Sequence, residues 1–169
     1  MDISQFPLAW RWTDAQDAVL PADVLAQIVP QTLEQAKVLF DESLGLTDRN
    51  GLGPELSSLK RIATKQADPP QITSWLLQRH AVAQTQGYLS WQPDTAVLTS
   101  WSIFAKYWDA FCYPASDDLI VLPIDRRCFT TVRNSCSMGF AADTSSKPKP
   151  LAARLMSGVC VSRAFIAGD

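Results

Sequence analysis

The sequence predicts an α+β fold, with N-terminal helices packed with a small, mostly antiparallel sheet around a central aromatic helix over residues 99–112. The first observation behind this prediction is that apolar residues in the central stretch recur at the spacing of one helix face. The second is that the apolar period changes from helical to alternating after Gly87. The apolar positions of the central helix are Trp101, Phe104, Ala105, Trp108, Phe111 and Cys112.

The length and composition of the chain fit one domain over residues 1–169. A chain of 169 residues, 47% hydrophobic and 19% charged, can bury a core that needs no disulfide or metal. Apart from the first residues, we divide it into a helical part at about 14–85, a sheet-forming part at about 88–140, an exposed loop at 141–150 that is rich in proline and small polar residues, and a tail at 151–169.

The segment before the helical part has alternating character. Leu8, Trp10 and Trp12 alternate with smaller or polar residues, which predicts a short half-buried strand or an extended arm. Helices are then expected where apolar residues recur every three or four positions between proline and glycine signals. The second of these helices should begin at Thr32, because Thr32 and Gln35 have the spacing of a capping box. We expect helices from Leu20 to Ile28, from Thr32 to Leu44, from Pro54 to Lys65 and from Ile72 to about Ala83.

The sheet-forming part contains short runs bounded by turn residues. Gln92-Pro93-Asp94 has proline at the first central position of a turn, which predicts a hairpin around it. Pro123 should close an inner strand, because proline cannot donate to a central ladder. In the tail we expect a short helix to Met156 and a strand from Val159 to Phe165. The predicted strands before the tail cover residues 88–91, 95–98, 119–122, 128–133 and 136–140.

The overall charge and hydropathy exclude two classes of partner. The net charge of −2 gives no electrostatic footprint for nucleic acid. No apolar run reaches the length of a membrane span, and the N-terminus lacks the positive and apolar regions of a signal peptide. We therefore expect a cytoplasmic protein that does not bind membranes. Its charge is uneven, with a net −6 over residues 1–55 (nine acidic and three basic) and +4 over 56–169 (eight acidic and twelve basic).

Metal and catalytic signatures are missing from the sequence. The single histidine, His80, and the cysteines Cys112, Cys128, Cys136 and Cys160 have none of the paired spacings that zinc sites use. We therefore predict no metal and no cofactor, and we read the cysteines as reduced thiols. A phosphate loop, a nucleophile elbow and a dinucleotide-binding glycine motif are all absent from the sequence. These observations favour a protein that is not an enzyme, with no catalytic residues.

Two groups of residues are candidates for contact with a partner. Ser116, Asp117 and Asp118 lie between the aromatic helix and an apolar strand, where loops often carry binding groups. The same residues are common turn formers, so a purely structural turn remains an alternative. Trp10, Trp12 and Trp91, near predicted edges, are the tryptophans we expect to be exposed and to mark a contact surface, and Trp10 and Trp12 are the ones we assign to partner binding.

The stretch TSWSIFAKYWDAFCYPASDD followed by LIVLP resembles a proteobacterial family of small proteins of unknown function, which share a W-x-x-F-x-x-x-W-x-x-F helix followed by an acidic pair. The resemblance extends loosely over residues 12–140 and is specific over 101–118. The layout is also similar to that of bacterial toxin-immunity proteins, which bind a toxin and perform no chemistry. The matching residues are Trp101, Phe104, Trp108, Phe111, Asp117 and Asp118.

The leading functional hypothesis is a non-catalytic cytoplasmic protein-binding module, of immunity or antitoxin type, whose partner is a toxin-like protein. A first alternative is a small metal-dependent hydrolase that uses Asp117 and Asp118. A second alternative is a structural subunit of a homo-oligomer, assembled through Trp10 and Trp12.

Overall fold

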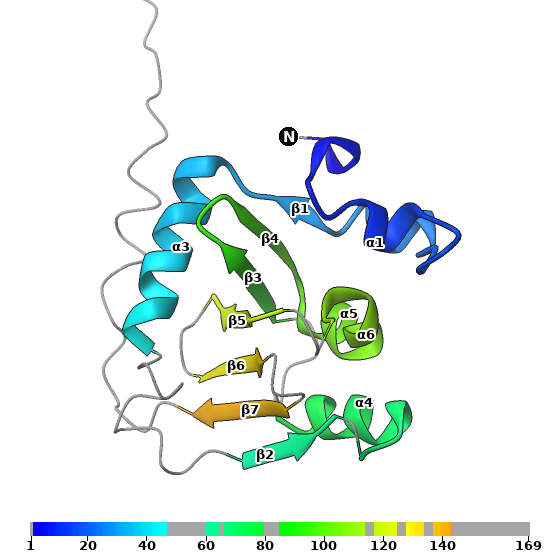
Figure 1. Cartoon of the computed structure of the whole chain (residues 1–169), viewed down its shortest axis with the longest axis vertical. Helices are drawn as coiled ribbons and strands as arrows, with labels where there is room; N and C mark the ends of the chain where they lie inside the picture. Colours follow the sequence, from blue (N-terminus) through cyan, green and yellow to red (C-terminus); the bar gives the residue numbers. More distant parts are fainter. Residues whose placement is uncertain are drawn as a thin grey trace, which may run out of the picture.

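A computed structural model of the chain describes residues 2–46, 60–64, 66–79, 85–113, 117–124, 128–133 and 137–142. These residues form an α+β fold in which helices cover both faces of an antiparallel sheet (Figure 1). Helix α3 lies over one face, and the short helices α1, α4, α5 and α6 lie along the other (Figure 1). The predicted fold class is confirmed.

The seven strands of the described residues pair in the order β1-β4-β3-β5-β6-β7-β2, and each of these pairings is antiparallel. The predicted hairpin around Pro93 is present as β3 and β4, and the later hairpin is present as β6 and β7. The strand β7 extends to Ala142. Residues 141 and 142 therefore belong to this strand and not to the exposed loop predicted over residues 141–150. The strands are β1 (Val29–Pro30), β2 (Lys60–Ala63), β3 (Gln86–Gln92), β4 (Thr95–Ser100), β5 (Leu119–Pro123), β6 (Cys128–Arg133) and β7 (Ser137–Ala142).

Alternation along the central strands produces two separate apolar faces. Leu89 on β3 lies opposite Val97 on β4 and Val121 on β5, and all three are buried in the larger core under the short helices. Neighbouring positions point the other way, so Leu122 and Ala96 pack with α3 in a second, smaller core. The central strands are therefore buried on both faces.

The N-terminal segment corrects one prediction. Residues 10–13 form a helical turn, α1 (Trp10–Thr13), in place of the expected strand or extended arm. Residues two positions apart, such as Trp10 and Trp12, share a face in a strand. On a helix they point about 200° apart, so the two indole side chains point in different directions. Trp12 is fully buried, whereas Trp10 is 44% exposed. A short 3₁₀ turn, η1 (Ile3–Gln5), precedes α1, and α2 (Ala22–Leu25) follows it, shorter than the predicted helix.

Helix α3 (Leu33–Leu46) begins as predicted. The amide of Gln35 donates to the Thr32 hydroxyl (3.3 Å), and the amide of Thr32 donates to the Gln35 side chain (3.1 Å), which completes the capping box. The side that faces the sheet carries Ala36 and Leu39, while Leu33 and Leu44 are exposed.

The predicted aromatic helix over residues 99–112 is two short helices, α5 (Trp101–Lys106) and α6 (Trp108–Phe111). They are interrupted at Tyr107, whose backbone lies outside the helical region (φ −117°, ψ 29°). The expected burial of the aromatic face is confirmed, because Trp101 and Trp108 are both buried. The indole N–H of Trp101 donates to the Leu76 carbonyl of α4 (3.1 Å), which ties α5 to α4.

Helix α4 (Pro69–Leu77) starts earlier than predicted, after the capping residue Asp68.

The helix predicted from Pro54 to Lys65 is wrong over residues 60–63, which form the strand β2. Its pairing with β7, in which Ile62 lies opposite Met138, supplies hydrogen bonds and packing that outweigh local helix propensity. Three predicted segments lie outside the described residues: the start of the helix predicted from Pro54, the end of the helix predicted from Ile72 to about Ala83, and the tail over residues 151–169. Within the described part of the chain, no helix has both the length and the apolar character that a bilayer crossing requires.

Candidate functional site

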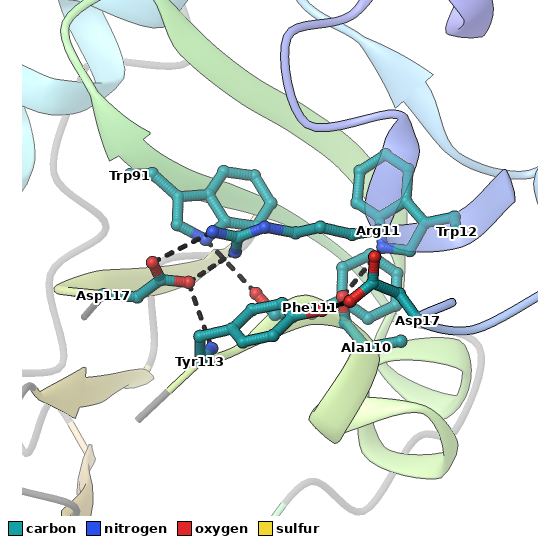
Figure 2. Close-up of polar contacts among 8 residues, drawn as sticks. All are labelled: Arg11, Trp12, Asp17, Trp91, Ala110, Phe111, Tyr113 and Asp117. Carbon is teal, nitrogen blue, oxygen red and sulfur yellow. Dashed lines mark hydrogen bonds and ion pairs between the residues drawn. The ribbon is translucent and has the colours of Figure 1, made fainter. Parts of the chain in front are cut away.

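The centre of the candidate site is a buried ion pair between Arg11 on α1 and Asp117, just before β5 (Figure 2). The two terminal nitrogens of the guanidinium each donate to one carboxylate oxygen, and the Nη2–Oδ1 distance is 3.1 Å. The backbone amide of Tyr113 donates to the same carboxylate at Oδ2 (3.1 Å). Both side chains are buried, with 7% and 9% of their surfaces exposed. Asp117 is therefore occupied by charge-assisted hydrogen bonds inside the protein.

Trp12 holds α1 against the end of α6, and Trp91 holds β3 against the same end. The indole N–H of Trp12 donates to the Ala110 carbonyl (3.0 Å), and that of Trp91 donates to the Phe111 carbonyl (3.2 Å). These carbonyls belong to the last turn of a helix, where no intrahelical amide is available to them. Trp12 also packs against the Phe111 ring, with centroids 5.2 Å apart. The polar and apolar contacts of Trp12 thus fix Arg11 at one place in the core.

Two aromatic rings, Trp10 and Tyr113, pack against the Arg11 guanidinium. The Trp10 ring lies 5.8 Å from the Tyr113 ring, centroid to centroid. The guanidinium carbon of Arg11 is 4.5 Å from the Tyr113 centroid and 5.3 Å from that of Trp10. The Tyr113 hydroxyl donates to Asp17 (2.7 Å), as Figure 2 shows. Trp10 is therefore exposed to solvent and supported from beneath by the ion pair.

Carboxylates accompany these two rings on the surface. Asp17 binds Tyr113, Asp14 caps the end of α1, and Asp118 follows the buried Asp117; all three aspartates are exposed. The charge of Arg11 is compensated by Asp117, and no other lysine or arginine precedes Lys37 in the sequence. We name the surface formed by Trp10, Asp14, Asp17 and Tyr113 the acidic aromatic patch.

Two titratable groups at the site are held in their neutral forms. Burial raises the pKa of the Tyr113 hydroxyl, and its hydrogen bond to Asp17 raises it further. Burial also raises the pKa of the Cys112 thiol well above its usual value, with the nearby Asp117 carboxylate acting in the same direction. A thiolate or phenolate nucleophile is therefore disfavoured at both residues.

The structure separates the sequence-predicted site residues. Asp117 points inward to Arg11, while Asp118 is exposed, so the adjacent carboxylates are not one paired group. Of the three tryptophans expected at a surface, Trp10 is exposed, whereas Trp12 and Trp91 are buried, so the expectation was wrong for these two. Ser116 lies outside the described residues.

Three contributors to the site were missed by sequence reasoning: Arg11, Tyr113 and Asp17. A usable signal existed for Arg11, because it is the sole cation in an acidic N-terminal segment and stands between two tryptophans. A cation in such surroundings is expected to pair with a carboxylate or an aromatic ring. Nothing in the sequence connects Tyr113 with Asp17, which lies 96 positions away.

Comparison with known proteins identifies no relative: no family model matches the chain, and no significant match is found among curated proteins or solved structures. The resemblance carried by the tryptophan-phenylalanine pattern therefore stays a prediction. In the described ranges, no three residues of the histidine, cysteine, aspartate and glutamate types are grouped as metal ligands. His80, Cys136 and Cys160 fall outside those ranges.

Proposed function

We propose that this protein is a non-catalytic protein-binding module, of immunity or antitoxin type, that covers a basic surface of a toxin-like partner with its acidic aromatic patch. The observation that carries the proposal is the exposed indole of Trp10 above the buried Arg11–Asp117 pair. The resemblance in layout to immunity proteins gives the class of partner.

The patch has the properties of a binding hot spot. Tryptophan and tyrosine dominate interface energetics, and an anchor that is already held in place loses little conformational entropy on binding. Trp10 and Tyr113 contact each other and the same guanidinium, so both rings are preorganised. The surrounding aspartates would accelerate association with a basic partner and disfavour an acidic one.

The two alternatives receive less support. A hydrolase built on Asp117 and Asp118 would need both carboxylates to face one ligand, but Asp117 accepts hydrogen bonds from Arg11 and from the Tyr113 amide. A homo-oligomer assembled through Trp10 and Trp12 would need both rings at the surface, and Trp12 is inside the core.

The direct test is co-expression of this protein with the products of the adjacent genes, followed by purification of any complex and a growth-protection assay. Trp10→Ala and Asp17→Asn should each weaken the complex by about ten-fold or more, since both residues belong to the patch. Leu33→Ala is the matched control, because Leu33 is 63% exposed on α3, on the opposite face of the sheet.

The affinity should also fall as the salt concentration rises, because the proposed attraction is between a negative and a positive surface. The proposal fails if no adjacent gene product binds and no protection is observed. It also fails if Trp10→Ala and Leu33→Ala bind a partner equally well.

A further inference from the structure

Strand β2 lies at the end of the sheet and pairs with β7 along one side only. Among the described residues no strand pairs with its outer side, and Lys60, Arg61 and Ala63 are exposed. An edge of this kind presents backbone N–H and C=O groups to which another extended chain can bind. Here the edge is four residues long, enough for a short segment of a partner.

A groove adjoins this edge. It has a volume of about 510 Å³ and lies between β2 and one side of α4, which are neighbours in Figure 1. The ring of Trp75 lies in its wall, and the guanidinium carbon of Arg79 is 4.6 Å from the centroid of that ring. A chain paired with β2 would direct alternate side chains toward one face, so an apolar side chain could enter the groove. The lining residues are Ile62, Pro70, Gln71, Ser74, Trp75 and Gln78.

The charges around the edge determine the chemistry of its occupant. Lys60 and Arg61 lie on β2, and Arg79 lies at the end of α4 beside the groove. The one carboxylate among the described residues from 60 to 79 is Asp68, the capping residue of α4. The edge is therefore basic, in contrast to the acidic aromatic patch on α1 and Tyr113.

We propose that β2 and the adjoining groove form a second docking site, which receives an acidic, extended segment of a protein partner as an additional strand of the sheet. The partner's backbone pairs with the outer side of β2, so its side chains alternate between the two faces of the sheet. Its acidic side chains lie on the face of Arg61, and one apolar side chain on the opposite face, which Ile62 shares with Lys60, enters the groove beside Trp75. A second copy of this chain is a poorer occupant, because antiparallel pairing of two β2 strands brings their lysines and arginines together. The site lies on elements other than those of the patch, so it does not depend on the proposed function.

The proposal can be tested on the full chain with a defined peptide of seven residues, acetyl-Glu-Val-Glu-Leu-Glu-Val-Glu-amide. A peptide with lysine at each glutamate position tests the role of charge, and a version N-methylated at alternate residues tests backbone pairing. Binding is followed by NMR, through the backbone amides of residues 60–63 and the indole N–H of Trp75. We expect shifts at these positions with the glutamate peptide and none with the other two.

Variants then locate the contact. Lys60→Glu combined with Arg61→Glu should weaken binding by about ten-fold or more, because the partner's charges are then repelled. Lys37→Glu combined with Lys106→Glu is the control, since it makes the same change in net charge at exposed positions on α3 and α5. Ser74→Phe tests the groove separately: it fills the space beside Trp75 and should weaken binding without changing the charge. Trp10→Ala should leave peptide binding unchanged, which separates this site from the patch.

Equal binding of the glutamate and lysine peptides would overturn the proposal, as would shifts confined to α1 and Tyr113. The absence of any shift at about 1 mM peptide, where even weak binding is detectable, would do so as well. If sedimentation shows a dimer that the Lys60→Glu and Arg61→Glu variant disrupts, the occupant is a second copy and the acidic-partner proposal is wrong.

Discussion

Arg11 and Asp117 are 106 positions apart in the sequence and form a buried, two-point ion pair that joins α1 to the segment between α6 and β5. Neither residue could be buried alone without a large desolvation cost. The Nε atom of Arg11 has no hydrogen-bond partner within the described structure, so the carboxylate is the main compensation for its charge. The pair therefore fixes the N-terminal segment, and with it Trp10, at one place.

Removing one member of this pair should strongly destabilise the protein. We expect Arg11→Met or Asp117→Asn to lower the free energy of unfolding by about 3–5 kcal/mol, because each leaves an uncompensated buried polar group. The double variant should be less destabilised than the sum of the two by about 1–3 kcal/mol. Urea unfolding followed by circular dichroism measures all three.

The exposed pair between Lys37 and Asp41 on α3 is the control for these variants. Because its members are 66% and 57% exposed, Lys37→Met should change stability by about 0.5 kcal/mol or less. Equal losses from Arg11→Met and Lys37→Met would contradict a structural role for the buried pair.

Trp108 should be a major source of stability. Its side chain is buried in the larger core, so Trp108→Ala should cost about 3–5 kcal/mol through lost contacts and a cavity. Val19→Ala, at a position that is 67% exposed, should change the unfolding free energy by about 0.5 kcal/mol or less. A loss below about 1 kcal/mol for Trp108→Ala would show that the aromatic face is not packed.

The thiol of Cys112 should be chemically inert in the folded protein. Burial and the nearby Asp117 raise its pKa, so little thiolate forms, and reagent cannot reach it. Treatment with iodoacetamide at about pH 8, followed by peptide mass spectrometry, should leave Cys112 unmodified in buffer and modify it fully in urea. Modification in buffer at the rate of glutathione would be incompatible with the observed burial.

Stability should fall at alkaline pH partly because of Tyr113. The pKa of its hydroxyl is raised in the folded state. The stabilisation from the neutral hydroxyl is therefore fully present below the pKa of the unfolded chain, about 10, and is lost as the pH rises through the higher pKa of the folded protein. In Tyr113→Phe the decrease in unfolding free energy above about pH 10 should be smaller than in the wild type. Tyr107→Phe is the comparison variant. An identical alkaline decrease in the wild type and Tyr113→Phe would rule out this contribution.

Several elements could be predicted because their signals are local. The capping box at Thr32 and the proline turn after Gln92 depend on residues within a few positions of one another, and both are present. The predictions failed where distant contacts decide the conformation. At residues 60–63, pairing with β7 overrides the helical pattern, and at α1 the packing of Trp12 against Phe111 selects a helical turn.

For the candidate site, the sequence identified Asp117, Asp118 and Trp10 as residues of interest, but it could not assign Asp117 to the interior. That assignment depends on Arg11, and nothing in the local sequence signals an interaction between the two residues.

The sequence by itself determined the α+β class, the strands around Pro93 and the burial of the aromatic face, because hydrophobic periodicity and turn chemistry act over short distances. Only the tertiary structure decided which tryptophan faces solvent, which aspartate is buried and which strand lies at the edge. Those properties follow from which segments meet in space, and the desolvation of a charge or the pairing of a strand depends on partners that are distant in the sequence.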